Sequence, residues 1–298
     1  MPKLKWLFSL IVCTGLSSIA VPARGQALLP YIPKLNSEQL EQQGLQLLQD
    51  AVQLIKFQQY ELALPRAELA TQLAPNTYEV WYILGSLYVQ QDQLDKGIQV
   101  LEKAEKLAPN QEGVLFTLGN AYFQQGNYQA ALEKLEAGLQ IKGDAPEALF
   151  DLGNTYLKLA QYQDAISSYE KAVSQEEKFW PAINNVGLVK YEQGDISEAM
   201  EQWQAALKID PEQTEPQLAL AVALYTQGEV DKGVELGEAA LANDSRYAEL
   251  QFLKDNLWGE RLLEDTKAFL ANPQMQAIVS RLKQETPADN SSETDLTP

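Results

Sequence analysis

The sequence contains no histidine among its 298 residues, and its single cysteine is Cys13. Histidine is the most frequent general acid or base in enzymes and a common zinc ligand, so its absence disfavours both kinds of site. Cys13 lies in an apolar N-terminal stretch, and loss of that stretch would leave a chain with no thiol and no disulfide. We therefore expect no catalytic residues, no metal site and no cofactor.

Basic residues are also scarce, with 23 Lys and Arg against 41 Asp and Glu and a net charge of -18. A chain this acidic repels phosphate backbones and anionic lipid surfaces, so we expect no binding to nucleic acid. Two interpretations of the surplus remain open. It keeps an apolar chain soluble, or it attracts a basic partner or peptide.

Residues 1–27 have the features of a secretory signal peptide. Lys3 and Lys5 precede an apolar run from Trp6 to Val21, and small residues follow at Ala23 and Ala27. The run is shorter than the roughly 20 residues of a membrane-spanning helix. An uncleaved anchor is the alternative. We expect export to the periplasm or an equivalent space, such as a thylakoid lumen, with membrane attachment only if residues 1–27 are retained.

An internal repeat organises the remaining chain. A motif that combines Leu or Ile with Gly, Asn and Tyr recurs every 34 residues, and its central small residue is Ala51, Gly85, Gly119, Gly153, Gly187 or Ala221. The period defines six contiguous units, at 44–77, 78–111, 112–145, 146–179, 180–213 and 214–247. Within each unit, apolar residues at helical spacing predict two helices with a polar turn between them. Gly126, Gly194 and Gly228 fall in these turns, where a left-handed conformation suits glycine.

These units resemble the tetratricopeptide repeat family. Residues 78–111 match its signature at Trp81, Leu84, Gly85, Tyr88, Gly97, Leu101, Ala104 and Pro109. The end units are weaker: the first has Asp50 and Ala51 in place of Leu and Gly, and the last has Gly237 in place of a large residue. The resemblance implies an all-α, right-handed superhelical solenoid of helix-turn-helix repeats. With the export signal, it is similar to exported bacterial members, among which a cyanobacterial origin is one option.

The flanks of the array suggest caps. Residues 28–43 form a lead-in and a capping helix that begins near Ser37 and continues into the first unit. Residues 248–284 predict further amphipathic capping helices, and residues 285–298, rich in Thr, Ser, Asp and Pro, predict a disordered tail.

The resemblance also implies a binding groove, lined by the first helix of each unit. Carried onto this sequence, the family's peptide-contacting positions give a candidate site at Tyr82, Ser86, Phe116, Asn120, Phe123, Phe150, Asn154, Asn184 and Tyr191. Asn side chains can satisfy the backbone donors and acceptors of an extended peptide, and aromatic rings can cover its apolar side chains. The alternative is that several rings pack against neighbouring helices and never meet a ligand.

Two functions follow. The first is a non-catalytic scaffold that binds a partner protein or extended peptide in its groove, for assembly of extracytoplasmic or membrane complexes. The second is a carboxylate-based enzyme or enzyme subunit that acts on cell-wall or polysaccharide substrates, for which Glu147 and Asp151 are the nearest candidate acids. A solvated helix face explains those two acids better, because no catalytic motif surrounds them.

Overall fold

A computed structural model describes residues 36–285, and this part of the chain is built of helices joined by short connections. The expected signal peptide, residues 28–35 of the lead-in and residues 286–298 of the expected tail lie outside the described residues. Between residues 36 and 285, no helix is both long enough and apolar enough to cross a membrane.

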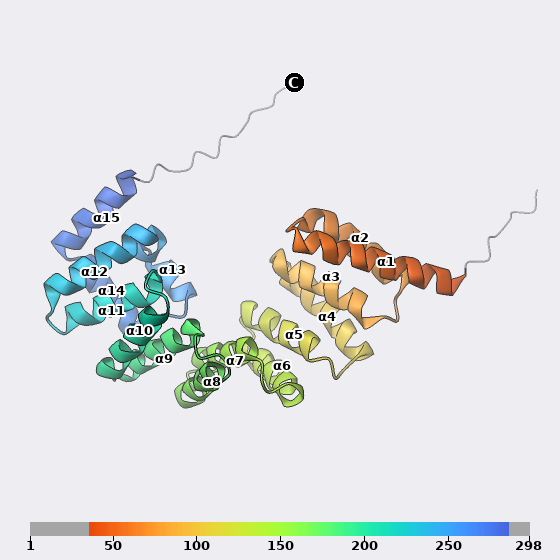
Figure 1. The fold of residues 1–298 in the computed structure, drawn as a ribbon, viewed down its shortest axis with the longest axis horizontal. Coiled ribbons are helices and arrows are strands. Elements are labelled where there is room, and N and C mark those ends of the chain that lie inside the picture. The colour runs from red at the N-terminus through yellow and green to blue at the C-terminus, as the bar shows by residue number, and fades with distance from the viewer. Residues whose placement is uncertain (1–35, 286–298) are drawn as a thin grey trace, which may run out of the picture. The chain divides into compact units, whose positions relative to one another are not determined.

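Twelve of the helices form six consecutive pairs, whose members are joined by two or three residues. In chain order (Figure 1) the pairs are α1 (Ser37–Lys56) with α2 (Tyr60–Leu73), α3 (Tyr78–Gln90) with α4 (Leu94–Leu107), α5 (Glu112–Gln124) with α6 (Tyr128–Ile141), α7 (Pro146–Lys158) with α8 (Tyr162–Gln175), α9 (Trp180–Gln193) with α10 (Ile196–Ile209), and α11 (Thr214–Thr226) with α12 (Val230–Asn243). From the second pair onward, the first helix of each pair also packs against the second helix of the pair before it. The expected all-α fold of stacked helix pairs is confirmed.

The second to fifth pairs are held together where a glycine of the first helix meets a large residue of the second. A Cβ added to Gly85 would lie 2.5 Å from Cγ of Leu101, and one added to Gly187 would lie 2.5 Å from Nε1 of Trp203. Leu101 and Trp203 are themselves fully buried. Because protein interiors are close-packed, no larger side chain fits at these glycines without moving the helices apart.

The turn inside every pair contains one residue with positive φ, at the same place in the 34-residue period. The six are Gln58, Asp92, Gly126, Ala160, Gly194 and Gly228, with φ from 57° to 90°. Three of them are not glycine, although a side chain in this left-handed region crowds its own backbone. The turn geometry is therefore imposed by the packing of the two helices rather than by the local residue.

Hydrogen bonds between tyrosine and glutamate connect successive pairs. The hydroxyl groups of Tyr88, Tyr122 and Tyr156 donate to Glu68, Glu102 and Glu136 of the preceding pair at 2.8, 2.9 and 2.7 Å. Burial, with the bonded Glu102, raises the pKa of Tyr122 to about 12. These bonds fix the register of one pair against the next.

The C-terminal helices follow the last pair. They are a 3-10 turn, η1 (Ser245–Ala248), and the helices α13 (Leu250–Asp255), α14 (Glu260–Leu270) and α15 (Pro273–Glu285). Helix α15 packs on α12, where Arg281 forms an ion pair with Glu238 at 2.5 Å. Helix α14 instead contacts α9 and α11.

The conserved turn geometry generates the first prediction. Replacing Ala160 with Gly should raise the free energy of unfolding by about 1 kcal/mol, because glycine relieves the crowding at φ 57° at a smaller cost in backbone entropy. The reverse change, Gly126→Ala, should lower the free energy of unfolding by a similar amount. No atom lies within 4 Å of the added Cβ, so this loss comes from the backbone conformation and not from a steric clash. Urea denaturation followed by circular dichroism measures both. Shifts of the same sign would contradict the assignment.

The tyrosine–glutamate bonds generate the second. Tyr122→Phe should lower the free energy of unfolding by about 1 kcal/mol, because it leaves the half-buried Glu102 carboxylate without its donor. Tyr128→Phe is the matched control, since its ring stacks on Phe123 and its hydroxyl has no hydrogen bond within residues 36–285. Equal losses for the two variants in the same urea assay would refute a role for the hydroxyl bond.

Candidate functional site

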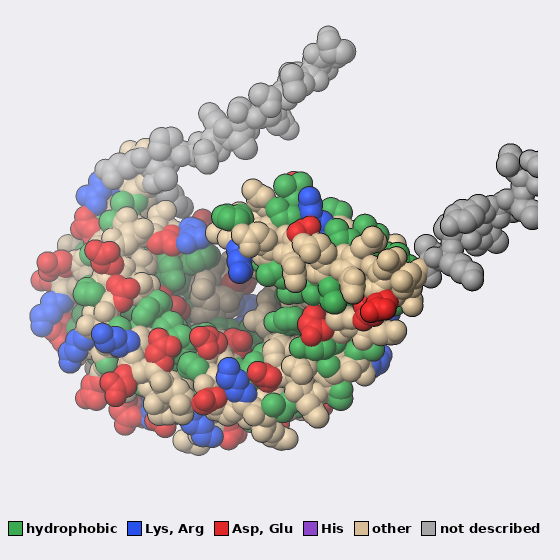
Figure 2. All heavy atoms as spheres, turned by 45° about the vertical axis from the view of Figure 1, so that its right-hand side comes forward, with side chains coloured by type: hydrophobic (Ala, Val, Ile, Leu, Met, Phe, Trp, Pro, Cys, Tyr) green, Lys and Arg blue, Asp and Glu red, His purple; other side chains and the backbone are tan. Residues whose placement is uncertain are grey.

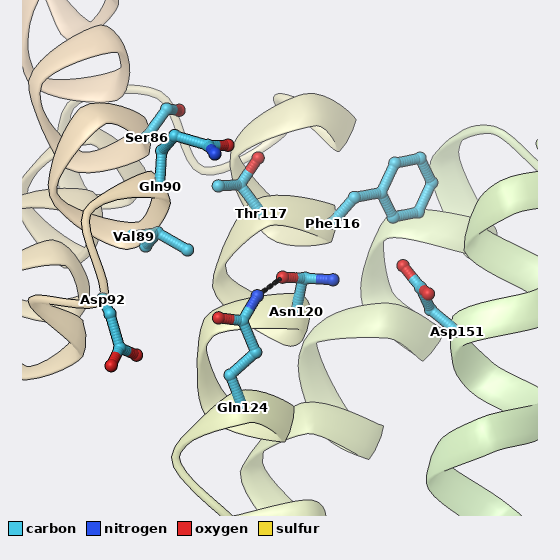
Figure 3. A pocket seen from close by; sticks show the side chains of 9 residues that line it. All are labelled: Ser86, Val89, Gln90, Asp92, Phe116, Thr117, Asn120, Gln124 and Asp151. Atoms are coloured by element: carbon cyan, nitrogen blue, oxygen red, sulfur yellow. Dashed lines mark hydrogen bonds between the residues drawn. The ribbon is translucent and has the colours of Figure 1, made fainter. Parts of the chain in front are cut away.

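A hollow of about 500 Å³ lies along the first helices of the second, third and fourth pairs. Helix α5 contacts both α3 and α7, so the side chains of the three helices form a continuous surface. The lining residues, shown in Figure 3, are Ser86, Val89, Gln90, Asp92, Phe116, Thr117, Asn120, Gln124 and Asp151. Three of the expected groove residues, Ser86, Phe116 and Asn120, are therefore brought together.

A relay of polar side chains crosses the floor of the hollow. Nε2 of Gln124 donates to Oδ1 of Asn120, which turns the Asn120 amide nitrogen toward Asp151 on the next pair (Figure 3). The proximity of this amide lowers the pKa of the Asp151 carboxyl group. Asn120 is thus held in one orientation and is not the free amide that the sequence suggested.

Asp151 is the chemically unusual member of the hollow. The pKa of Asp151 is raised to about 6. Burial is the main cause, the charge of Glu147 one turn earlier adds to it, and the Asn120 amide acts in the opposite direction. Between residues 36 and 285, no Lys or Arg forms a salt bridge with Asp151. The hollow therefore contains a carboxylate that is partly desolvated and has no cationic partner.

The two hydroxyl groups that line the hollow already donate hydrogen bonds within their own helices. The hydroxyl groups of Ser86 and Thr117 donate to the backbone carbonyls of Tyr82 and Gly113 on their own helices, each at 2.8 Å. This leaves only their acceptor lone pairs for a ligand. The Phe116 ring is half-buried and extends from α5 toward α7, on the same side as Asp151 (Figure 3).

Three other expected groove rings do not line the hollow. Tyr82 lies against Gly113, with its hydroxyl 3.6 Å from the position of an added Cβ. Phe123 packs on Tyr128 at 5.4 Å between ring centroids, and Phe150 packs between Tyr169 and Phe179 at 5.7 and 5.5 Å. These rings mainly join helices, which matches the alternative raised for them from the sequence.

Two expected asparagines are buried in a polar network. Asn154, only 8% exposed, accepts hydrogen bonds from Tyr169 at 2.8 Å and from Asn185 at 2.9 Å. Asn184 is 0% exposed and donates to Asn185 at 3.0 Å. Neither faces an open groove. Oδ1 of Asn154 and Nδ2 of Asn184 are therefore occupied, whereas Oδ1 of Asn184 has no hydrogen-bond partner between residues 36 and 285.

Tyr191 is also 0% exposed, and the C-terminal helices explain why. Its hydroxyl donates to Asp265 of α14 at 2.7 Å. The next residue, Glu192, accepts the backbone N–H groups of Arg261 and Leu262 at 3.2 and 3.0 Å, which caps the N-terminus of α14. Helix α14 therefore lies over the surface of α9 and α11 that was expected to be open.

The segment before α14 closes the same surface. Trp258 is 3% exposed, and its Nε1 donates to Glu215 of α11 at 2.9 Å. Burial raises the pKa of Glu215 to about 7, although hydrogen bonds with Trp258 and Asn184 lower it. The groove expected along all six units is consequently covered by residues 258–270 at the last two pairs, while the hollow at α3, α5 and α7 is open.

Sequence reasoning missed two features of the site. It treated Asp151 as part of a solvated helix face, although the same position of the period holds Thr117 in the preceding unit and Asn185 in the following one. It also gave no reason to place α14 over α9. That contact depends on Glu192 and Gly259, which are far apart in the sequence and belong to no motif.

The half-buried Glu215 generates the third prediction. Its pKa rises from 4.5 to about 7 on folding, so the folded chain holds a proton that the unfolded chain releases. This contribution makes stability fall as pH rises from about 4.5 to 7. Glu215→Gln keeps an acceptor for Trp258 and should be more stable than the native chain at pH 8, by about 2 kcal/mol, but not at pH 4.5.

Urea denaturation at the two pH values measures this difference. The control is Glu212→Gln, an exposed residue just before the same helix, which should leave the pH dependence unchanged. If the free energy of unfolding of Glu215→Gln depended on pH as it does in the native chain, a group other than Glu215 would be responsible.

Comparison with known sequences identifies the repeat. The model described as TPR repeat matches residues 119–160 and 187–228, and the one described as tetratricopeptide repeat matches residues 146–179. A third, described as anaphase-promoting complex, cyclosome, subunit 3, matches residues 56–137. The comparison with curated protein sequences finds no match.

Solved structures share the fold at low identity. The Cut9–Hcn1 hetero-tetramer of the APC/C is 16% identical with a TM-score of 0.60, over 76% of this chain and 45% of that one. PilF of Pseudomonas aeruginosa is 14% identical with a TM-score of 0.58, over 78% and 98%. YrrB, described as a TPR protein with an unusual peptide-binding site, is 19% identical with a TM-score of 0.53, over 64% and 95%. The matched segments and the shared fold show that this chain carries tetratricopeptide repeats.

Proposed function

We propose that this protein is a non-catalytic scaffold that binds a segment of a partner protein, as an extended peptide, in the hollow formed by α3, α5 and α7. The observation that carries the proposal is the hollow itself. It is about 500 Å³ in volume, and a ring, amides, hydroxyls and two carboxylates line it. Ligand sites are concave surfaces of this size and mixed chemistry.

The fold supports the same conclusion. Stacked helix pairs present an extended surface made of equivalent positions, and proteins of this architecture are typically interaction scaffolds. YrrB, which shares the fold, is described as having a peptide-binding site. In this chain α14 covers α9 and α11, so we place the partner at the earlier pairs.

The proposal includes six tetratricopeptide repeats, at residues 44–247, and a place outside the cytoplasm. The place outside the cytoplasm follows from the basic and apolar pattern of residues 1–27, which is typical of export signals. In that setting the scaffold would assemble extracytoplasmic or membrane complexes, in a bacterium and, as one option, a cyanobacterium.

A carboxylate-based enzyme is the second candidate. A carboxyl group with a raised pKa in a hollow is a feature of general acids, and Asp151 has it. The second acid of the hollow, Asp92, comes from the opposite end of the lining (Figure 3). Hydrolysis of cell-wall or polysaccharide substrates by the purified chain, abolished in Asp151→Asn, would favour this candidate over the scaffold.

The fourth prediction tests the scaffold. Peptides selected from a random display library on the purified full chain should bind with micromolar affinity. Thr117→Tyr, which fills the hollow, should weaken that binding at least tenfold. Ser174→Tyr adds the same ring to an exposed position of α8 and should not change it. Fluorescence anisotropy with labelled peptides measures the affinities.

Selected peptides that bind both variants as tightly as the native chain would contradict a site in the hollow. If no peptide were selected, the extended-peptide proposal would itself be wrong.

A further inference from the structure

The chemistry of the hollow narrows the kind of partner it accepts. Its two charged lining residues, Asp92 and Asp151, are both acidic, and no Lys or Arg lines it. The whole chain carries a net charge of -18. In Figure 2, Asp and Glu side chains are spread over the visible face. A cationic ligand is therefore attracted at long range and meets no positive charge in the hollow.

Asp151 is placed to receive that cation. The Asn120 amide nitrogen points toward its carboxylate, in the orientation that Gln124 fixes through Oδ1 (Figure 3). A carboxylate only accepts hydrogen bonds. Apart from the Asn120 amide, no protein donor between residues 36 and 285 approaches the Asp151 carboxylate. Its remaining acceptor positions are available to a ligand.

The Phe116 ring completes the site. It lies on the same side of Asn120 as Asp151, between α5 and α7 (Figure 3). An aromatic face attracts a cation, and a guanidinium or an aliphatic ammonium stem also packs against it. A carboxylate and an aromatic ring on the same side of a hollow are two groups to which a basic side chain binds well.

We infer that the hollow selects a peptide by an Arg or Lys side chain that pairs with the Asp151 carboxylate and lies against the Phe116 ring. This inference rests on the proposed function, since it names the kind of peptide that the same hollow binds. The ligand is thus a basic segment of a partner protein.

The test uses peptides selected on the full chain, with each Arg replaced by citrulline and each Lys by acetyl-lysine. These replacements remove the charge and keep most of the shape. Native chain should lose at least tenfold in affinity for the neutral peptides. Asp151→Asn, which keeps an acceptor for Asn120, should bind the original peptides at least tenfold more weakly and should no longer distinguish the two forms.

Asp164→Asn is the matched control. Asp164 is exposed on α8, so the variant carries the same change in net charge away from the hollow and should bind like the native chain. The charge reversal Asp151→Lys supplies a gain of function, because it should prefer peptides in which Glu replaces the basic residue. Circular dichroism establishes that each variant is folded.

The outcomes separate the inference from the function beneath it. Peptides that Thr117→Tyr excludes, but that bind Asp151→Asn and the neutral forms unchanged, would overturn the basic side chain and leave the groove intact. Equal losses in Asp151→Asn and Asp164→Asn would reduce the effect to overall charge and overturn it as well. If Thr117→Tyr binds normally, the groove itself fails.

Discussion

The close crossing of two helices within each pair is the contact on which the rest of the structure depends. A glycine on the first helix meets a buried side chain of the second, as Gly85 meets Leu101 and Gly187 meets Trp203. In the last pair the equivalent residue of the second helix is itself a glycine, Gly237. The space beside it is filled by Phe269 of α14, whose Cζ lies 2.5 Å from the position of a Cβ at Gly237. The large residue that packs against the last pair at this position therefore comes from the C-terminal segment.

That substitution has a consequence for binding. Phe269 is fully buried and packs on Tyr225 of α11 at 5.3 Å between ring centroids. Once it is inserted, the N-terminal end of α14 reaches α9, where Glu192 caps it and Tyr191 donates to Asp265. The packing of Phe269 beside Gly237 is thus accompanied by the placement of α14 across the last two pairs of the array. The surface left open is the one at α3, α5 and α7, where Asp151 and Phe116 lie.

Polar groups are treated differently along the array, and burial is the reason. At the third and fourth pairs, Asn120 and Asp151 are at the edge of a hollow and keep access to solvent or ligand. Asn154, also on the fourth pair, and Asn184 on the fifth are buried instead, where Oδ1 of Asn154 accepts from Tyr169 and Nδ2 of Asn184 donates to Asn185. Equivalent residues of a repeat therefore differ in function according to what covers them.

The sequence by itself determined the helix pairs, because a 34-residue period of small and large residues admits only one way to pack them. It also predicted the left-handed glycines of the turns and the grouping of Ser86, Phe116 and Asn120. It could not separate an open groove position from a covered one, since Phe116 and Asn184 occupy the same position of the repeat. Only the tertiary structure decided that, because the cover comes from Phe269 and Trp258, whose partners are distant in the sequence. For the same reason, the desolvated Asp151 became visible only when α5 and α7 were placed side by side.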